Sequence, residues 1–190
     1  MGEALTARAR EIVAVARELL ESEGADAMTM RRVADRLGIR APSLYKHLPD
    51  KAALESAIIV AGFEEAAAAF EAATADADEA VEPMAALVQA YRAFVAANPN
   101  VYRLMTERPL PRQQLPAGLE ARTAAPLVRA AGGAAQARAA WAFIHGMVML
   151  ELNQRFPSDG VTEQAWSAGI TAFHAGGHPR APGSPALHAD

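Results

Sequence analysis

"TMRRVADRLGIRAPSLYKHLPDKAAL", residues 29–54, is the stretch that decides the fold. Thr29 is a favoured helix N-cap, and Gly38 ends the short helix that follows it. Pro42 suits the first turn of a second short helix, where its missing N–H costs little. A further proline then breaks the chain before Asp50, which caps a long helix. Two short helices joined through a tight turn and preceded by a packing helix predict a helix-turn-helix.

Basic residues are concentrated in this stretch. Six basic and two acidic residues give Met28–Lys51 a charge of +4, whereas the whole chain has a net charge of −4, so the remainder carries −8. Lys46 and Lys51 are the only lysines among the 190 residues. Because binding to an acidic polymer depends on the local field, the cluster predicts contact with a phosphate backbone.

The composition of the whole chain is that of a globular protein. Hydrophobic residues make up 52% and charged residues 21%, which is enough for a sizeable core. The absence of cysteine excludes disulfides, thiolate metal sites and a cysteine nucleophile. No run reaches the ~18 apolar residues of a membrane helix, and no signal-peptide pattern is present. We expect a cytoplasmic protein with no membrane partner and no cofactor.

Frequent alanine and a 3.6-residue periodicity predict an all-α fold of about nine helices. "TADADEAVEP", residues 74–83, is interpreted as an acidic joint. "RPLPRQQLP", residues 108–116, is interpreted as a loop that cannot be helical. Helices are expected over residues 6–23, from 29 to the turn at 38, around 42, then over 50–75, 83–97, 102–107, 117–131, 134–156 and 161–175.

The chemistry of the second short helix suits DNA. In a helix-turn-helix this element enters the major groove, and its flanks hold phosphates. Arg40 can grip guanine O6 and N7, and Lys46 can read a base or act as a point charge. Ser43 and Tyr45 can donate to phosphates, and Lys51 lies in a first helical turn whose N–H groups also face anions. A plain solvated helical face is the alternative, because surface arginines occur on many all-α proteins.

The same residues resemble the N-terminal DNA-binding region of the TetR family of bacterial transcriptional regulators. The resemblance covers about Ala7–Ile58 and rests on several landmarks at the family spacing: Thr29, Ala34, Leu37-Gly38-Ile39, Leu44-Tyr45-Lys46-His47-Leu48 and Lys51. It implies a homodimer with paired recognition helices, most often a repressor that binds a palindromic operator and is released by a small molecule.

The resemblance also implies roles for individual residues. Candidates for base or nearby phosphate contact are Arg31, Arg40, Ala41, Pro42 and Ser43. The implied phosphate clamps are Thr29, Tyr45, His47 and Lys51. Ala41 and Pro42 offer only apolar contact, such as to a thymine methyl, so polar readout falls to Arg40 and Lys46. For His47 an alternative is an aromatic-sized filler that closes the core of the helix-turn-helix.

A second stretch, "WAFIHGMVMLELNQRF" (Trp141–Phe156), resembles the Trp-His-Gly signature of a TetR subgroup through Trp141, His145 and Gly146. A glycine inside a helix costs ~1 kcal/mol against alanine, so Gly146 predicts a close helix approach or a ligand. His145 and Glu151 lie in an apolar run and are candidates to orient a ligand in a pocket. A structural histidine, hydrogen-bonded inside the core, is the alternative for His145.

Residues of the C-terminal half are candidates for an effector site. The candidates are Tyr91, Phe94, Tyr102, Met105, Trp141, His145 and Met149, although stripes of Met and aromatic residues more often belong to a core. The last two long helices are expected to form the four-helix dimer interface, as in the family. His174 and His178 have no evident third ligand, so we expect no metal site.

Three functions compete at this point. The leading hypothesis is a ligand-responsive, dimeric DNA-binding repressor. It assigns residues 1–58 to a helix-turn-helix DNA-binding domain, 59–175 to a helical ligand-binding and dimerisation domain, and 176–190 to a disordered tail. An α-helical enzyme is disfavoured, since no nucleophile–base pair or paired carboxylates are evident. A helical ligand-binding module that no longer reads DNA is the remaining alternative, and the basic cluster argues against it.

Overall fold

The computed structural model describes residues 5–75 and 82–174, and within those ranges it contains helices and no strand. The all-α prediction is confirmed. The helices are α1 Ala7–Glu23, α2 Met30–Arg36, α3 Ala41–Leu44, α4 Lys51–Ala75, α5 Pro83–Ala97, α6 Pro99–Thr106, α7 Leu119–Ala130, α8 Ala134–Leu152 and α9 Thr162–His174, with one 3₁₀ turn, η1, at Arg112–Gln114.

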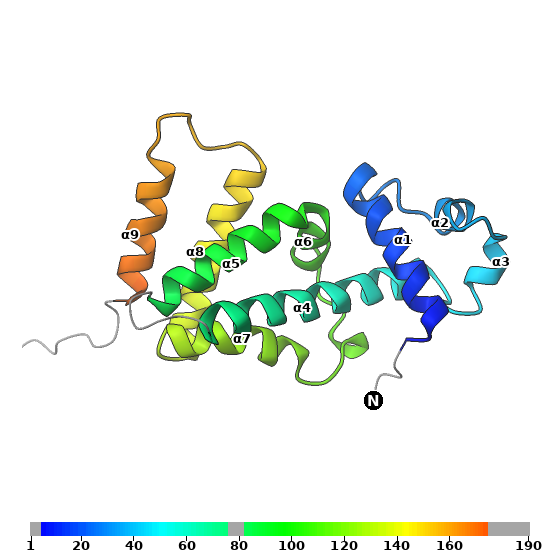
Figure 1. Cartoon of the computed structure of the whole chain (residues 1–190), viewed down its shortest axis with the longest axis horizontal. Helices are drawn as coiled ribbons and strands as arrows, with labels where there is room; N and C mark the ends of the chain where they lie inside the picture. The colour runs from blue at the N-terminus through cyan, green and yellow to red at the C-terminus, as the bar shows by residue number, and fades with distance from the viewer. Residues whose placement is uncertain (1–4, 76–81, 175–190) are drawn as a thin grey trace, which may run out of the picture.

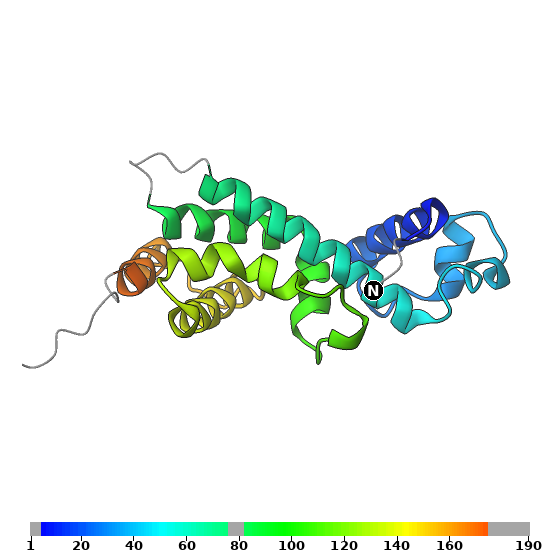
Figure 2. The same ribbon diagram turned by 90° about the horizontal axis from the view of Figure 1, so that it is seen from below.

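The molecule is elongated along α4. Helices α1–α3 lie at one end, and α9 lies at the opposite end in both views (Figure 1, Figure 2). Helix α4 has 25 residues and runs from the α1–α3 group into the larger group, where it packs mainly against α5 and α7. The predicted boundary at residue 58 therefore falls inside a continuous helix. In the described part of the chain no helix is long and apolar enough to cross a membrane.

Local capping explains where the first helices begin. The Thr6 hydroxyl accepts from the Ala9 N–H at 3.1 Å, and the Thr29 hydroxyl accepts from the Arg32 N–H at 3.3 Å. Asp50 Oδ1 accepts from the Ala53 N–H at 2.7 Å at the start of α4. Gly38 has φ +65°, in the left-handed region that glycine tolerates, where the chain leaves α2. The caps predicted at Thr29 and Asp50 are confirmed.

A single set of apolar side chains holds α1–α4 together. The predicted stripe of α1 is buried, and residues from α2, α3 and the start of α4 complete the core. The apolar stripe and its partners are Ile12, Val13, Ala16, Leu19, Leu20, Val33, Ala34, Leu44, Leu48 and Leu54. This packing fixes α3, which has only four residues and could not be stable alone.

The structure differs from the sequence prediction in one loop and at the ends of two helices, α6 and α8. The proline-rich loop was expected to contain no helix, yet Arg112–Gln114 forms a 3₁₀ turn. These three residues lie between prolines, and the Ser56 hydroxyl of α4 bonds the Gln114 side chain. Helix α6 begins at Pro99, earlier than predicted, because proline is favoured in a first helical turn. Helix α8 ends at Leu152, before a left-handed residue at Gln154.

Two glycines allow helices to approach closely. A Cβ at Gly62 of α4 would lie 2.7 Å from the Met105 Sδ and 2.9 Å from the Val101 Cγ1 of α6. A Cβ at Gly169 of α9 would overlap the Phe143 ring of α8. The first contact joins α4 to α6, and the second seats α9 on α8.

Candidate functional site

The predicted DNA-binding residues lie together on the outer side of α2, α3 and the start of α4. Ala41 and Lys51 are half-buried, and the other eight are exposed: Thr29, Arg31, Arg40, Pro42, Ser43, Tyr45, Lys46 and His47. Half of the Tyr45 surface, 50%, is accessible. Because His47 is also exposed, the alternative in which it fills the core is wrong.

The six cations of this region are not equivalent. Arg32 and Arg36 both pair with Glu23 of α1, at 2.6 and 2.8 Å. Hydrogen bonding from Arg32, together with the charge of Arg36, lowers the pKa of the Glu23 carboxyl. Sequence spacing could not reveal this pairing, since Glu23 precedes Arg36 by 13 residues and a loop.

Three cations remain available for an anionic partner. Arg31, Arg40 and Lys46 are exposed, and none has an ion pair or a side-chain hydrogen bond within residues 5–75 and 82–174. Arg40 immediately precedes α3, and Lys46 follows its end. The free positive charge therefore brackets the helix that was predicted to enter the major groove.

Lys51 has partners inside the protein. Its Nζ donates to the Ala25 carbonyl oxygen at 3.4 Å and lies 3.6 Å from Glu55 Oε1. Arg108 of the proline-rich loop lies 3.8 Å from the same Glu55 oxygen. Lys51 thus ties the α1–α2 connection to α4, and contact with a phosphate would have to share its ammonium with these groups.

Four of the seven predicted effector residues form one hydrogen-bond chain. The Trp141 indole N–H donates to the Tyr91 hydroxyl oxygen at 3.1 Å. The Tyr91 and Tyr102 hydroxyl oxygens are 2.8 Å apart, and the Tyr102 hydroxyl is 2.7 Å from the His145 Nδ1. The chain connects α5, α6 and α8, which sequence spacing alone did not predict.

Burial shapes the chemistry of this chain. Burial raises the pKa of Tyr91 and of Tyr102, and the neighbouring Tyr91 adds to the shift of Tyr102. Burial lowers the pKa of His145, partly offset by the negative charge of Glu107. Neutral side chains are therefore favoured at all three positions. Trp141 differs from them, because 48% of its surface is accessible.

The other predicted effector residues are part of the core or its edge. Phe94 packs edge-on against Phe70, with ring centroids 6.3 Å apart, and Met105 lies against Gly62. Met149 is half-buried on α8. Phe94 and Met105 are thus packed against protein, as the core alternative for such stripes predicts.

Glu151 is engaged within the protein. Its Oε1 accepts from Arg92 at 2.7 Å and from the Trp166 indole N–H at 2.9 Å. Arg92 also pairs with Glu163 at 2.7 Å and stacks over the Trp166 ring, 4.9 Å from its centroid. Glu151 therefore joins α5, α8 and α9, and the expectation that it orients a ligand is not supported. Arg92 and Trp166 were not predicted as site residues.

Gly146 has open space beside it. A Cβ at this position would meet no atom within 4 Å in the described part of the chain. The close approach of another helix, which was one of the two predictions for Gly146, therefore does not occur among the described residues.

The histidine pair considered for a metal lies at the end of α9. His174 ends this helix, and His178 lies outside the described residues. Among the described side chains no group of three metal ligands occurs.

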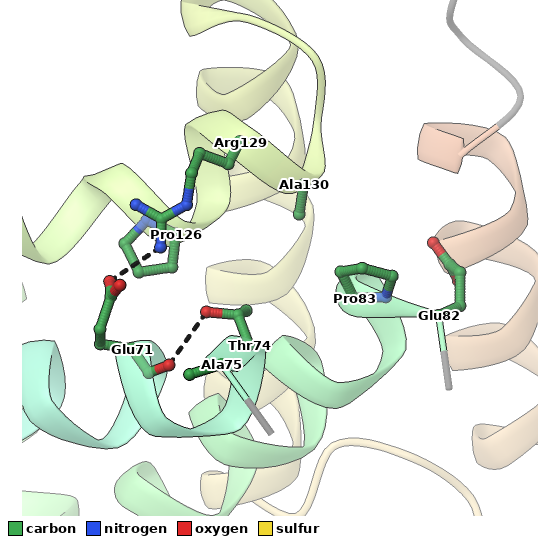
Figure 3. A pocket seen from close by; sticks show the side chains of 8 residues that line it. All are labelled: Glu71, Thr74, Ala75, Glu82, Pro83, Pro126, Arg129 and Ala130. Carbon is green, nitrogen blue, oxygen red and sulfur yellow. Dashed lines mark hydrogen bonds and ion pairs between the residues drawn. The ribbon is translucent and has the colours of Figure 1, made fainter. Parts of the chain in front are cut away.

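A cleft of about 460 Å³ lies at the far end of α4, between α4, α5 and α7. Figure 3 shows Glu71 and Arg129 across it, joined by an ion pair of 2.8 Å. Its wall is formed by Glu71, Thr74, Ala75, Glu82, Pro83, Pro126, Arg129 and Ala130. None of the seven predicted effector residues lines this cleft.

Helix α6 is tied to the end of α1. The Glu21 carboxylate accepts from the Asn100 N–H at 3.1 Å and from the Val101 N–H at 2.8 Å. The Asn100 side chain returns hydrogen bonds to the Leu20 and Glu21 carbonyl oxygens. Because α6 also carries Tyr102, one short helix connects the hydrogen-bond chain with the helix-turn-helix end.

Solved structures share this fold. A protein with unknown function from Rhodococcus sp. RHA1 is 25% identical, with a TM-score of 0.73 over 90% of this chain and 95% of that chain. The TetR family protein ActR of Streptomyces coelicolor, solved with (S)-DNPA, is 19% identical, with a TM-score of 0.60 over 92% and 98%. A TetR variant from Acinetobacter baumannii AYE, in complex with minocycline, is 20% identical, with a TM-score of 0.58 over 86% and 90%. Comparison with curated proteins gives no match.

Sequence models of protein families match both parts of the chain. Residues 12–58 match the model described as "Bacterial regulatory proteins, tetR family". Residues 84–173 match "Tetracyclin repressor-like, C-terminal domain". Together they cover more than half of the 190 residues, and both describe regulators, not enzymes. The chain therefore belongs to the TetR family of bacterial DNA-binding regulators.

Proposed function

We propose that this regulator is a repressor that binds a palindromic operator as a homodimer and is released by a small molecule in the cytoplasm. The observation that carries the proposal is the set of free cations, Arg31, Arg40 and Lys46, around an exposed α3. In this proposal residues 1–58 bind DNA, and residues 59–175 bind the ligand and the partner; residues 176–190 lie outside the described range.

Selection of bound sequences from random duplex DNA tests operator reading directly. We expect the protein to enrich a palindrome and Arg40→Ala to relax base choice at one position in each half-site, a change of ~1–3 kcal/mol. Arg122→Ala is the matched control, because Arg122 is an exposed arginine on α7. Enrichment of no motif would favour the alternative, a helical ligand-binding module that no longer reads DNA.

The outer faces of α8 and α9 support the homodimer. On α8 Ala142 and Leu150 are exposed, and Gly146 between them has open space. On α9 the exposed residues include Ala168 and Ala172. Small residues let helices of two protomers approach, which suits a four-helix interface. We expect sedimentation equilibrium to give a dimer for the full chain and Gly146→Arg to shift it towards monomer, and an unchanged dimer would remove this face from the interface.

Release would follow from a population shift between two spacings of the recognition helices. Helix α4 is continuous from the DNA end to the C-terminal helices, and the α1–α6 contact offers a second route. Of the proposed effector residues, Tyr91, Phe94, Tyr102 and Met105 are buried, and Trp141, His145 and Met149 are more accessible. We also propose that the chain belongs to the Trp-His-Gly subgroup, since Trp141, His145 and Gly146 all lie on α8.

A further inference from the structure

The polarity of the Trp141–Tyr91–Tyr102–His145 chain is determined by hydrogen-bond counting. The Tyr91 oxygen accepts from the Trp141 N–H, and the Tyr102 oxygen is the one acceptor that the described residues offer to the Tyr91 hydroxyl hydrogen. The Tyr102 hydrogen then goes to the His145 Nδ1. If Nδ1 carried a hydrogen, the order would reverse and the Tyr91 hydrogen, in a side chain only 7% exposed, would have no acceptor.

The counting assigns the tautomer of His145. Nδ1 accepts the hydrogen bond from Tyr102, and Nε2 carries the hydrogen of a neutral ring. Nε2 has no hydrogen-bond partner among the described residues. No buried side-chain nitrogen or oxygen in those residues lacks a partner, so Nε2 is reachable from solvent. The chain thus ends in one fixed outward donor.

Apolar side chains flank this donor on α8. Trp141 lies one turn before His145, with ring centroids 5.9 Å apart, and Met149 lies one turn after it. Trp141 is 48% exposed, so its ring is accessible beside the donor. This arrangement places an aromatic and an aliphatic side chain on either side of a single hydrogen-bond donor.

The charges around the donor favour a neutral ligand. His145 is neutral by the counting above, and the charge that acts on it is the carboxylate of Glu107, which is 2.8 Å from Arg103. Arg138 is on the same flank of α8 but lies two turns before His145, ~10 Å along the axis. Because Arg103 already balances Glu107, a carboxylate at Nε2 would have no unpaired cation close by to offset its desolvation.

We propose that the effector is a neutral, planar aromatic compound with a carbonyl oxygen, which accepts from the His145 Nε2–H while its ring covers Trp141 and Met149. The proposal rests on the proposed function, in which residues 59–175 bind a small molecule. It specifies the chemical class: a carbonyl acceptor is required, an anionic acceptor is disfavoured, and a compound that offers only donors has no partner at this site.

Three probes of the same size test the class: acetophenone, ethylbenzene without the acceptor, and benzoate with an anionic one. The indole N–H signals of the full-length protein report binding by NMR, because Trp141 lies at the site while Trp166 is held by Glu151 and serves as an internal control. We expect acetophenone to shift the Trp141 signal alone and to bind about tenfold more tightly than either other probe, the effect of one hydrogen bond.

Two variants separate the donor from the apolar surface. His145→Ala should remove the preference for acetophenone over ethylbenzene. Met149→Ala should lower the affinity for both probes and leave the ratio of the two affinities unchanged. Equal binding of acetophenone and ethylbenzene, a preference for benzoate, or no shift at Trp141 would overturn the proposal. Operator affinity, measured without any probe, tests the proposed function separately. If the protein binds acetophenone selectively but binds no operator, the proposed function is contradicted and the ligand class is not.

Discussion

Two glycines in the middle of helices have opposite surroundings. A Cβ at Gly146 would meet open space within the described chain, and a Cβ at Gly169 would overlap the Phe143 ring. We expect Gly146→Ala to raise the free energy of unfolding by up to ~1 kcal/mol through helix propensity. Gly169→Ala should lower it by ~1–3 kcal/mol through overpacking. Urea denaturation at one fixed protein concentration measures both.

Each glycine controls for the other, because both changes add the same methyl group to a helix. If Gly146→Ala instead lowers the free energy of unfolding, a group from outside the described chain must approach that position. The sequence showed that Gly146 is unusual in a helix and left its neighbour undetermined. Gly169 also lies inside a predicted helix, and only the structure places Phe143, 26 residues earlier in the printed sequence, against it.

At the scale of single elements, α6 links α1 to α5 and α8 through hydrogen bonds. Its first N–H groups are bound by Glu21 of α1, and its Tyr102 bonds with α5 and α8. We expect Glu21→Ala to lower the free energy of unfolding by about 1–2 kcal/mol, because two N–H groups lose a charged acceptor that is partly exposed. We also expect operator affinity to respond less to effector, since the hydrogen bonds between α6 and α1 are then reduced to those of the Asn100 side chain.

Glu18→Ala is the matched control for this helix. It removes the same charge from an exposed position of α1, and among the described residues its side chain makes no hydrogen bond or ion pair with α6. Chemical denaturation and a direct operator titration with and without effector would compare the two variants. If both respond alike, the α1–α6 contact does not carry coupling, and continuous α4 is left as the route.

Helix starts were predictable because their causes are local. Thr29 and Asp50 cap N–H groups only three residues away, so the sequence pattern contained the whole interaction. The 3₁₀ turn at Arg112–Gln114 was missed although its backbone hydrogen bond, from the Gln114 N–H to the Pro111 carbonyl oxygen, is local. The partners of Glu151 were not predictable in this way, because Arg92 and Trp166 lie on two other helices.

At the scale of the whole molecule, charge is separated along the chain. Residues 28–51 carry +4 within a chain of net charge −4. We therefore expect operator affinity to fall steeply as salt concentration rises, because each phosphate contact releases counterions. Lys46→Ala should reduce the slope of log K against log salt by ~0.9, and Arg32→Ala should change it less, because Arg32 is already paired with Glu23.

Fluorescence anisotropy with a labelled operator duplex at several salt concentrations checks this expectation. An affinity that does not depend on salt would contradict phosphate contact by the basic cluster. A similar loss of slope in both variants would show that the Glu23 pairs open on DNA. Salt dependence reports phosphate contacts and does not report base readout. The alternative that the protein no longer reads DNA is therefore tested by the selection of bound sequences from random duplex DNA.

The sequence by itself determined the all-α class, the helix-turn-helix with its caps, and the concentration of basic residues in it. These features follow from periodicity and from contacts within one or two turns, which a single sequence contains. Only the tertiary structure decided which charges are free. It paired Arg32 and Arg36 with Glu23, and it joined Tyr91, Tyr102, Trp141 and His145 into one chain. The physical reason is distance along the chain: partners that come from separate helices meet only when those helices pack.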